Sequence, residues 1–256
     1  MLGKLLKYDL KWTYKVLVVF YGLTLFFALL GRGFSLIDTS VFEFLSAFSY
    51  GTSVTFMFNI LINNVMRLWA RFVSNIYKDE SYLTHTLPVT KNDIYFSKVI
   101  CTIVTFITSF IVILLSFYIC YAGSDLVSWL KGFITDSLWS VLGLIILVLV
   151  LEILFIQMVG YLGIIIGYSF NELKTVKSLI FGFGIYMASS VVSLICMVIY
   201  GLFDSRVMDL FTSNNTIPEI SLFKSILIFA SILYLTYIVV CNIISMKLIK
   251  RGVNVD

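Results

Sequence analysis

The chain has 256 residues, of which 60% are apolar and 12% are charged, with a formal net charge of +4. Soluble domains are nearer 45–50% apolar and about 25% charged, so eighteen basic and fourteen acidic side chains are too few to cover a soluble protein of this length. Composition therefore excludes a soluble globular domain and predicts an all-α integral membrane protein.

The first fifteen residues, MLGKLLKYDLKWTYK, predict an amphipathic elbow helix at the membrane surface. They do not resemble a secretion signal, because lysines recur throughout the segment. Lys4, Lys7 and Lys11 recur every three or four residues and form one stripe. Asp9 lies in the middle of the opposite, apolar face, so we expect it to meet a protein partner or a lysine.

Six long apolar runs follow, and Glu152 is the one charged residue inside them. An ionised side chain at the bilayer centre costs at least about 2.5–3.5 kcal/mol, so charges collect at the ends of spans. About 20 residues cross a hydrocarbon core of about 30 Å, and most of the runs reach that length. They predict six transmembrane helices, at about 16–31, 44–66, 99–124, 137–168, 178–203 and 225–246.

Basic residues assign the two sides of the membrane. With the N-terminus in the cytosol, fourteen of the eighteen basic residues fall on cytosolic segments. We therefore expect a multi-pass protein with both termini in the cytosol, and the net charge needs no nucleic-acid partner to explain it. The cytosolic set is Lys4, Lys7, Lys11, Lys15, Arg67, Arg71, Lys78, Lys91, Lys98, Lys174, Lys177, Lys247, Lys250 and Arg251.

A polar stretch, DESYLTHTLPVTKNDIYFSK at 79–98, separates the second and third spans. The segment KDESYLTHTL predicts a short helix that Pro88 ends, because the residue before a proline is pushed out of the α region. Thr90 is a predicted N-cap for the helix that continues as the third span. Tyr82, Leu83 and Leu87 lie among small polar groups, a composition suited to docking into a groove on a partner. An ordinary solvated loop is the alternative.

Several kinds of chemistry have no signature in the chain. The four cysteines lie inside apolar runs without C-x-x-C spacing, and a single histidine cannot supply a multi-histidine metal site. The sequence contains no phosphate-binding G-x-x-x-x-G-K-[ST] motif and no hydrolase or zinc-protease motif. We therefore expect no cofactor on this chain, and energised work would need a separate subunit.

The loop reads YLT-x-TLPV-T-K after an acidic residue, and with this motif the chain resembles the permease subunits of bacterial ABC-2 type transporters. The likeness extends in layout over the whole chain, from the elbow helix to an outer segment at 203–221, where that family has short re-entrant helices. Within the family the chain is similar to Gram-positive exporters of amphipathic peptides, including phenol-soluble-modulin exporters, and to lantibiotic-immunity permeases. The residues that carry the likeness are Glu80, Tyr82, Leu83, Thr84, Thr86, Leu87, Pro88, Val89, Thr90 and Lys91.

The resemblance implies a permease in the bacterial cytoplasmic membrane whose coupling loop, 71–97, docks onto a separate ATPase subunit that binds ATP and Mg²⁺. An ion-coupled carrier or channel and a membrane-embedded enzyme are the alternatives. We expect no catalytic residue and no metal site on this chain. The residues expected to couple to the ATPase are Asp79, Glu80, Tyr82, Leu83, Thr84, Leu87 and Pro88.

Glu152 is expected to face a protein interior or a water-filled cavity, because a charged group is expensive in lipid. Gln157 lies about 140° farther round the same helix and does not share its face.

Gly163 and Gly167 have the small-x-x-x-small spacing of close helix packing. Six spans enclose no pathway alone, so we expect a second permease copy. The 16% aromatic content with few charges favours amphipathic peptides or hydrophobic compounds as cargo.

Overall fold

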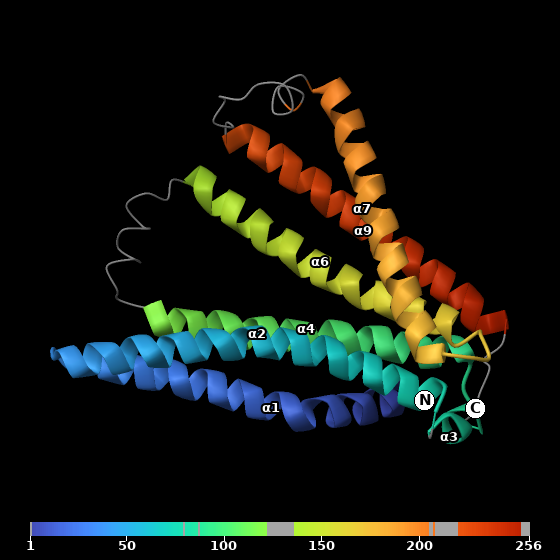
Figure 1. The fold of residues 1–256 in the computed structure, drawn as a ribbon, viewed down its shortest axis with the longest axis horizontal. Coiled ribbons are helices and arrows are strands. Elements are labelled where there is room, and N and C mark those ends of the chain that lie inside the picture. Colours follow the sequence, from blue (N-terminus) through green and yellow to red (C-terminus); the bar gives the residue numbers. More distant parts are fainter. Residues whose placement is uncertain are drawn as a thin grey trace. The chain divides into compact units, whose positions relative to one another are not determined.

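The structure is a computed structural model and describes residues 2–78, 80–86, 88–121, 136–204, 207 and 220–251. Six of its helices are long and apolar enough to cross a membrane, which confirms the all-α, six-span architecture. In the described residues all regular secondary structure is helical (Figure 1). The helices are α1 (Leu2–Phe34), α2 (Ser40–Ile76), α3 (Ser81–Thr86), α4 (Lys91–Tyr121), α6 (Asp136–Gly167), α7 (Lys174–Phe203) and α9 (Ile220–Arg251).

The long helices extend beyond the predicted spans. The expected elbow residues form the first turns of α1, which continues without a break to Phe34. Likewise α2 runs on to Ile76 and α4 already begins at Lys91, so only residues 77–90 of the predicted 71–97 loop connect the two helices. The reason is that charged residues mark where the hydrocarbon ends, whereas the backbone hydrogen bonds of a helix continue into the aqueous layer.

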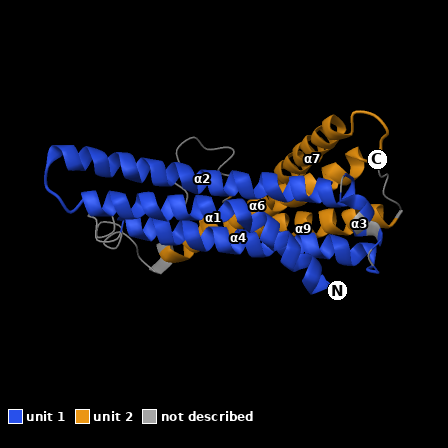
Figure 2. Ribbon diagram, turned by 90° about the horizontal axis from the view of Figure 1, so that it is seen from below, with its two compact units in different colours: residues 1–133 blue, residues 134–256 orange. Residues whose placement is uncertain are grey.

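The chain divides into two compact units, Met1–Phe133 and Ile134–Asp256 (Figure 2). In unit 1, α1 packs against both α2 and α4, and α3 packs against α2. Figure 1 shows α1, α2 and α4 side by side along their length, with α3 at the end where α2 stops and α4 starts. In unit 2, α6 packs against both α7 and α9.

Small hydroxyl side chains line the helix contacts of unit 1. The buried residues of α1 and α2 recur every three or four positions, as a helix packed along one face requires. Ser46 Oγ donates to the Gly31 carbonyl at 3.0 Å, and Ser53 Oγ donates to the Thr24 carbonyl at 3.0 Å. Lipid is as apolar as the helices, so close packing and hydrogen bonds of this kind hold spans together.

In unit 2, glycines allow the helices to pack closely. A Cβ placed on Gly163 would lie 2.8 Å from the Gly182 backbone, and one on Gly167 would collide with Ser178. The predicted close packing at Gly163 and Gly167 is thus confirmed, and the partner is α7 of the same chain. α7 also contacts α9, where the rings of Tyr200 and Phe229 stack with their centroids 4.7 Å apart.

Gly163→Ala is expected to lower the free energy of unfolding by about 1–3 kcal/mol, because the added methyl group meets backbone atoms that cannot turn away. Gly143→Ala on the same helix is the matched control, since nothing lies within 4 Å of its ideal Cβ position. Thermal unfolding in detergent, followed by the helical circular dichroism signal, measures both. Equal melting temperatures for the two variants would contradict the packing assigned to Gly163.

Candidate functional site

Five polar side chains meet at the end of unit 1 that carries α3. Asp9 comes from the third turn of α1, and Lys98 comes from the third turn of α4. Arg71 and Asn75 come from the last turns of α2, and Glu80 immediately precedes α3. We call these five residues the charged ring. It joins all four described helices of unit 1.

The ring is a closed circuit of hydrogen bonds. Asp9 Oδ1 accepts from Lys98 Nζ at 2.6 Å and from Arg71 Nε at 3.2 Å. Arg71 Nη1 donates to both Glu80 carboxylate oxygens, at 2.8 and 2.7 Å. Asn75 closes the circuit, because its Nδ2 donates to Glu80 Oε2 at 2.6 Å while its Oδ1 accepts from Lys98 Nζ at 2.6 Å.

Because the ring is largely buried, each of its charged groups depends on its partners for stabilisation. Asp9 is 3% exposed, Lys98 5% and Arg71 9%, whereas the Glu80 side chain is 41% exposed. Two carboxylates face two cations, so the ring carries no net charge. Taking an ion out of water costs several kcal/mol unless it is paired and its remaining donors and acceptors are satisfied. Removing the Asp9 carboxylate therefore leaves two buried cations without their shared counter-ion.

The ring lies about one hydrocarbon thickness from the opposite end of α1. At a rise of about 1.5 Å per residue, Gly31 is about 33 Å from Asp9 along the helix axis. On α4, Tyr121 is about 35 Å from Lys98 by the same measure. A hydrocarbon core of about 30 Å fits between these levels, so the ring lies at the membrane boundary.

Local hydrogen bonds hold α3 and the start of α4 in the described part of the connection between α2 and α4. Thr84 Oγ1 donates to the Glu80 carbonyl at 2.9 Å, which ties α3 to the ring residue before it. At the start of α4, Thr90 Oγ1 accepts from the Asp93 backbone N–H at 3.2 Å and donates to Asp93 Oδ2 at 2.8 Å. This reciprocal pair confirms Thr90 as the N-cap.

The residues predicted to couple to an ATPase divide into two groups. Tyr82 is 77% exposed and Pro88 is exposed, so both are accessible to a partner. Thr84 is buried, and the Glu80 carboxylate binds Arg71 and Asn75 inside the ring. Asp79, Leu87 and the side chain of Leu83 lie outside the described part of the structure.

The elbow residues behave as two faces of one helix. Lys4, Lys7 and Lys11 are exposed, while Asp9 is buried against Lys98. The expectation that Asp9 meets a lysine is confirmed. In the sequence, Arg71 and Lys98 stand out only as charges that fix topology, and nothing there marks Asn75 as their partner. The available signal was the Arg71–Asn75 spacing of four, which puts both side chains on one helix face.

In unit 2, the structure does not bring Glu152 to Gln157. Glu152 is partly exposed on α6 and Gln157 is fully buried. Nearly all of the predicted outer segment, 203–221, lies outside the described residues. In the part of the chain that the structure describes, no three His, Cys, Asp or Glu side chains are grouped so that they could hold a metal ion.

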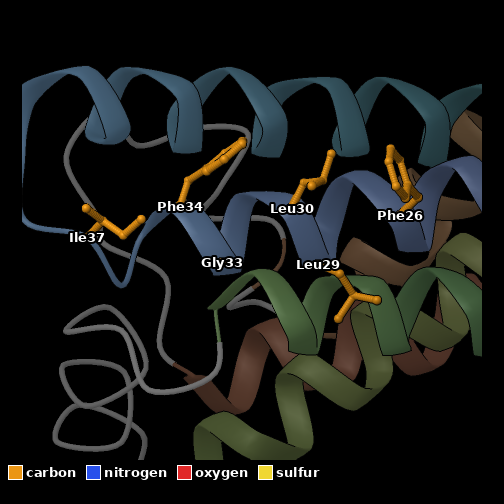
Figure 3. A pocket seen from close by; sticks show the side chains of 6 residues that line it. All are labelled: Phe26, Leu29, Leu30, Gly33, Phe34 and Ile37. Carbon is orange, nitrogen blue, oxygen red and sulfur yellow. The ribbon is translucent and has the colours of Figure 1, made fainter.

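An apolar hollow of about 370 Å³ lies along the far end of α1 in unit 1. Figure 3 shows the side chains that follow this stretch, with Phe26, Leu30 and Phe34 on one side of the helix and Leu29 on the other. The lining residues offer no polar group that would orient a ligand. They are Phe26, Leu29, Leu30, Gly33, Phe34 and Ile37.

Comparisons of the chain with family models, with curated proteins and with solved structures give no match. The charged ring and the exposed face of α3 are therefore interpreted from their own geometry.

Asp9→Asn is expected to lower the free energy of unfolding by about 3–5 kcal/mol, because it leaves buried Lys98 and Arg71 without their shared carboxylate. Glu80→Gln should cost about 1 kcal/mol or less, because Glu80 is half-exposed and water screens its pair with Arg71. The measurement is thermal unfolding of the purified protein in detergent.

Asp38→Asn, an exposed position between α1 and α2, controls for the loss of one negative charge and should leave stability unchanged. A ring that holds unit 1 together requires the order Asp9→Asn, then Glu80→Gln, then Asp38→Asn. Similar stabilities of the Asp9→Asn and Asp38→Asn variants would refute that role.

Proposed function

We propose that the chain is the membrane permease subunit of an ATP-driven ABC-2 type exporter that works with a separate ATPase subunit. The observation that carries the proposal is the position of α3. This short helix presents Tyr82 to the surroundings, while Glu80 just before it is bound to Arg71, Asn75 and through them to Asp9 and Lys98. A partner that docks on α3 would therefore act on every described helix of unit 1.

The mechanical argument depends on stiffness. A flexible loop would absorb a push from a partner, but α3 is short, packs against α2 and is followed by a capped helix start at Thr90. Its displacement must either break the hydrogen bonds of Glu80 to Arg71 and Asn75 or move the ends of α2 and, through the ring, of α1 and α4 with it. A coupling element needs a stiff connection of this kind between the docking surface and the helices.

Sequence and membrane position support the same assignment. The chain has no motif for binding nucleotide phosphates, so an ATP-driven process needs another subunit. The excess of basic residues on these segments supports a cytosolic position for the ring, α3 and both termini, as the proposed bacterial permease requires. The docking surface then lies on the side of the membrane where ATP is available.

The proposed assembly contains two permease copies, most simply identical, with two ATPase chains. Amphipathic peptides or hydrophobic compounds are the proposed cargo, because the spans are rich in aromatic rings and poor in charge. The alternative, an ion-coupled carrier or channel, would need no ATPase and no exposed docking helix. A membrane-embedded enzyme would need catalytic groups close together in the spans.

Tyr82→Ala is expected to weaken ATPase binding roughly 30-fold, the effect of losing an aromatic anchor worth about 2 kcal/mol. The tagged chain would be purified in mild detergent from the membranes of the cells that encode it. ATP hydrolysis and the amount of ATPase polypeptide in the eluate would then be measured. The wild-type chain should retain both.

Tyr8→Ala is the matched control, because Tyr8 is also highly exposed, at 66%, and lies on the first turns of α1 rather than on α3. It should retain the ATPase as the wild-type chain does. No ATPase with any variant, together with ion-gradient-driven transport by the purified chain in liposomes, would replace the proposal with the carrier alternative. Equal ATPase recovery with Tyr82→Ala and Tyr8→Ala would remove α3 as the docking element.

A further inference from the structure

Arg67 is a cation at the α1–α2 contact that lies outside the charged ring. Its Cζ atom lies 4.3 Å from the centroid of the Trp12 ring of α1, and its Nη2 donates to the Trp12 carbonyl at 2.9 Å. Arg71 contacts the same indole ring at 5.4 Å. Two guanidinium groups thus share one aromatic ring, and the carboxylates that bind there, those of Asp9 and Glu80, are both bound to Arg71.

The charge of Arg67 is not compensated within the described part of the chain. No ion pair of the described residues includes Arg67, and its buried Nε atom has no hydrogen-bond partner there. The residue as a whole is only partly buried, so an anion from outside the chain can approach it. The flat fork of N–H groups on a guanidinium matches the oxygen atoms of a phosphate or carboxylate group.

Lys15 adds a second positive charge beside Trp12. It is exposed and lies three residues after Trp12 on α1, so the two side chains are neighbours on the helix surface. Helices α1 and α2 contain one acidic residue each. Asp9 is paired inside the charged ring, and Glu43 lies in the first turn of α2, about 36 Å from Arg67 along the helix. The surface around Trp12 is therefore positive.

The same surface lies at the membrane boundary and continues as apolar surface. Trp12 is three residues beyond Asp9, or about 4.5 Å along the α1 axis toward the bilayer centre, a level at which tryptophan is common. Val19 is seven residues after Trp12, hence on the same face, and is 58% exposed, while Met66 beside Arg67 is 57% exposed. A ligand at this place meets cations at one end and apolar side chains along its length.

We propose that Arg67 and Lys15 bind the phosphate group of an anionic phospholipid, in the leaflet on the side of the charged ring. The phosphate oxygens accept hydrogen bonds from the Arg67 guanidinium and pair with the Lys15 ammonium group. Trp12 holds Arg67 in place, and the acyl chains lie along Val19 and Met66. This site does not depend on the proposed function, because binding a lipid requires neither an ATPase nor a cargo.

Charge and depth select this occupant over two others. Soluble phosphate would neutralise the cations but would leave the apolar surface beside them uncovered. A zwitterionic phospholipid has the same phosphate, but its own ammonium group is repelled by the second cation of the site. Basic groups near the membrane surface attract anionic lipids by about 1 kcal/mol each, so an anionic phospholipid satisfies both parts of the site.

The test uses the full chain purified in detergent, with phosphatidylglycerol or phosphatidylcholine of the same acyl chains added, and native mass spectrometry to measure the lipid-bound fraction. The wild type should bind one phosphatidylglycerol about tenfold more tightly than phosphatidylcholine. Arg67→Gln should weaken phosphatidylglycerol binding about tenfold, or about 1.4 kcal/mol. Arg67→Lys should recover part of the loss, because it keeps the charge but not the fork of donors.

Two further variants separate the site from general surface charge. Lys15→Gln changes an exposed side chain and should weaken phosphatidylglycerol about threefold, even if Arg67→Gln disturbs the helix contact. Lys7→Gln is the matched control, because Lys7 is also exposed on α1 but lies five residues before Trp12 and about 140° round the helix. It should bind as the wild type does. Thermal unfolding in lipid-free detergent establishes that each variant is folded.

Three results would overturn the site: equal binding of the two lipids by the wild type, wild-type affinity in both Arg67→Gln and Lys15→Gln, or the same loss in Lys7→Gln as in Lys15→Gln. The last of these would show attraction by the net charge of α1 alone. Displacement of bound phosphatidylglycerol by millimolar inorganic phosphate would assign the cations to a soluble anion and overturn the lipid as occupant.

Discussion

A closed ring of five side chains holds one end of unit 1 together. Asp9, Arg71, Asn75, Glu80 and Lys98 each bind two neighbours in the ring, so no member can be moved without leaving a donor or acceptor unsatisfied. Hydrogen bonds in such circuits strengthen one another, and buried charges make the cost of an incomplete circuit high. The ring therefore fixes the spacing of the helix ends and, through Glu80, the position of α3.

Beyond the ring, the helices of the two units are held together by different kinds of contact. Unit 1 uses serine and threonine hydroxyls, many of which also bond to carbonyls one turn back in their own helix, such as Thr105 to Cys101 and Ser109 to Thr105. Unit 2 uses glycine at Gly163 and Gly167 together with aromatic rings. Both kinds of contact stabilise helix association in lipid, where the hydrophobic effect does not drive apolar helices together.

Much of this arrangement could be predicted from the sequence. The six spans follow from the cost of charge in lipid, the start of α4 follows from Thr90, and the need of Asp9 for a cation follows from its place on an apolar face. The identity of that cation could not be predicted, because several lysines and arginines lie at the same membrane level and only the packing of α1 against α4 selects Lys98. That Glu80 binds α2 could not be predicted either. An acidic residue beside an exposed helix has the same sequence pattern whether it contacts a partner protein or the preceding helix.

The long sequence separation within the ring also orders the synthesis of unit 1. Asp9 is 62 residues from Arg71 and 89 residues from Lys98. During synthesis, Asp9 is therefore followed first by Arg71 and only later by Lys98. Before α4 is synthesised, the ring groups of α1 and α2 lie at the membrane boundary, where water and lipid headgroups can solvate them. A charge at the middle of either helix would lie in hydrocarbon and would not be solvated. The placement of the ring at the edge of the bilayer thus allows each helix to be inserted in turn and the circuit to be closed last.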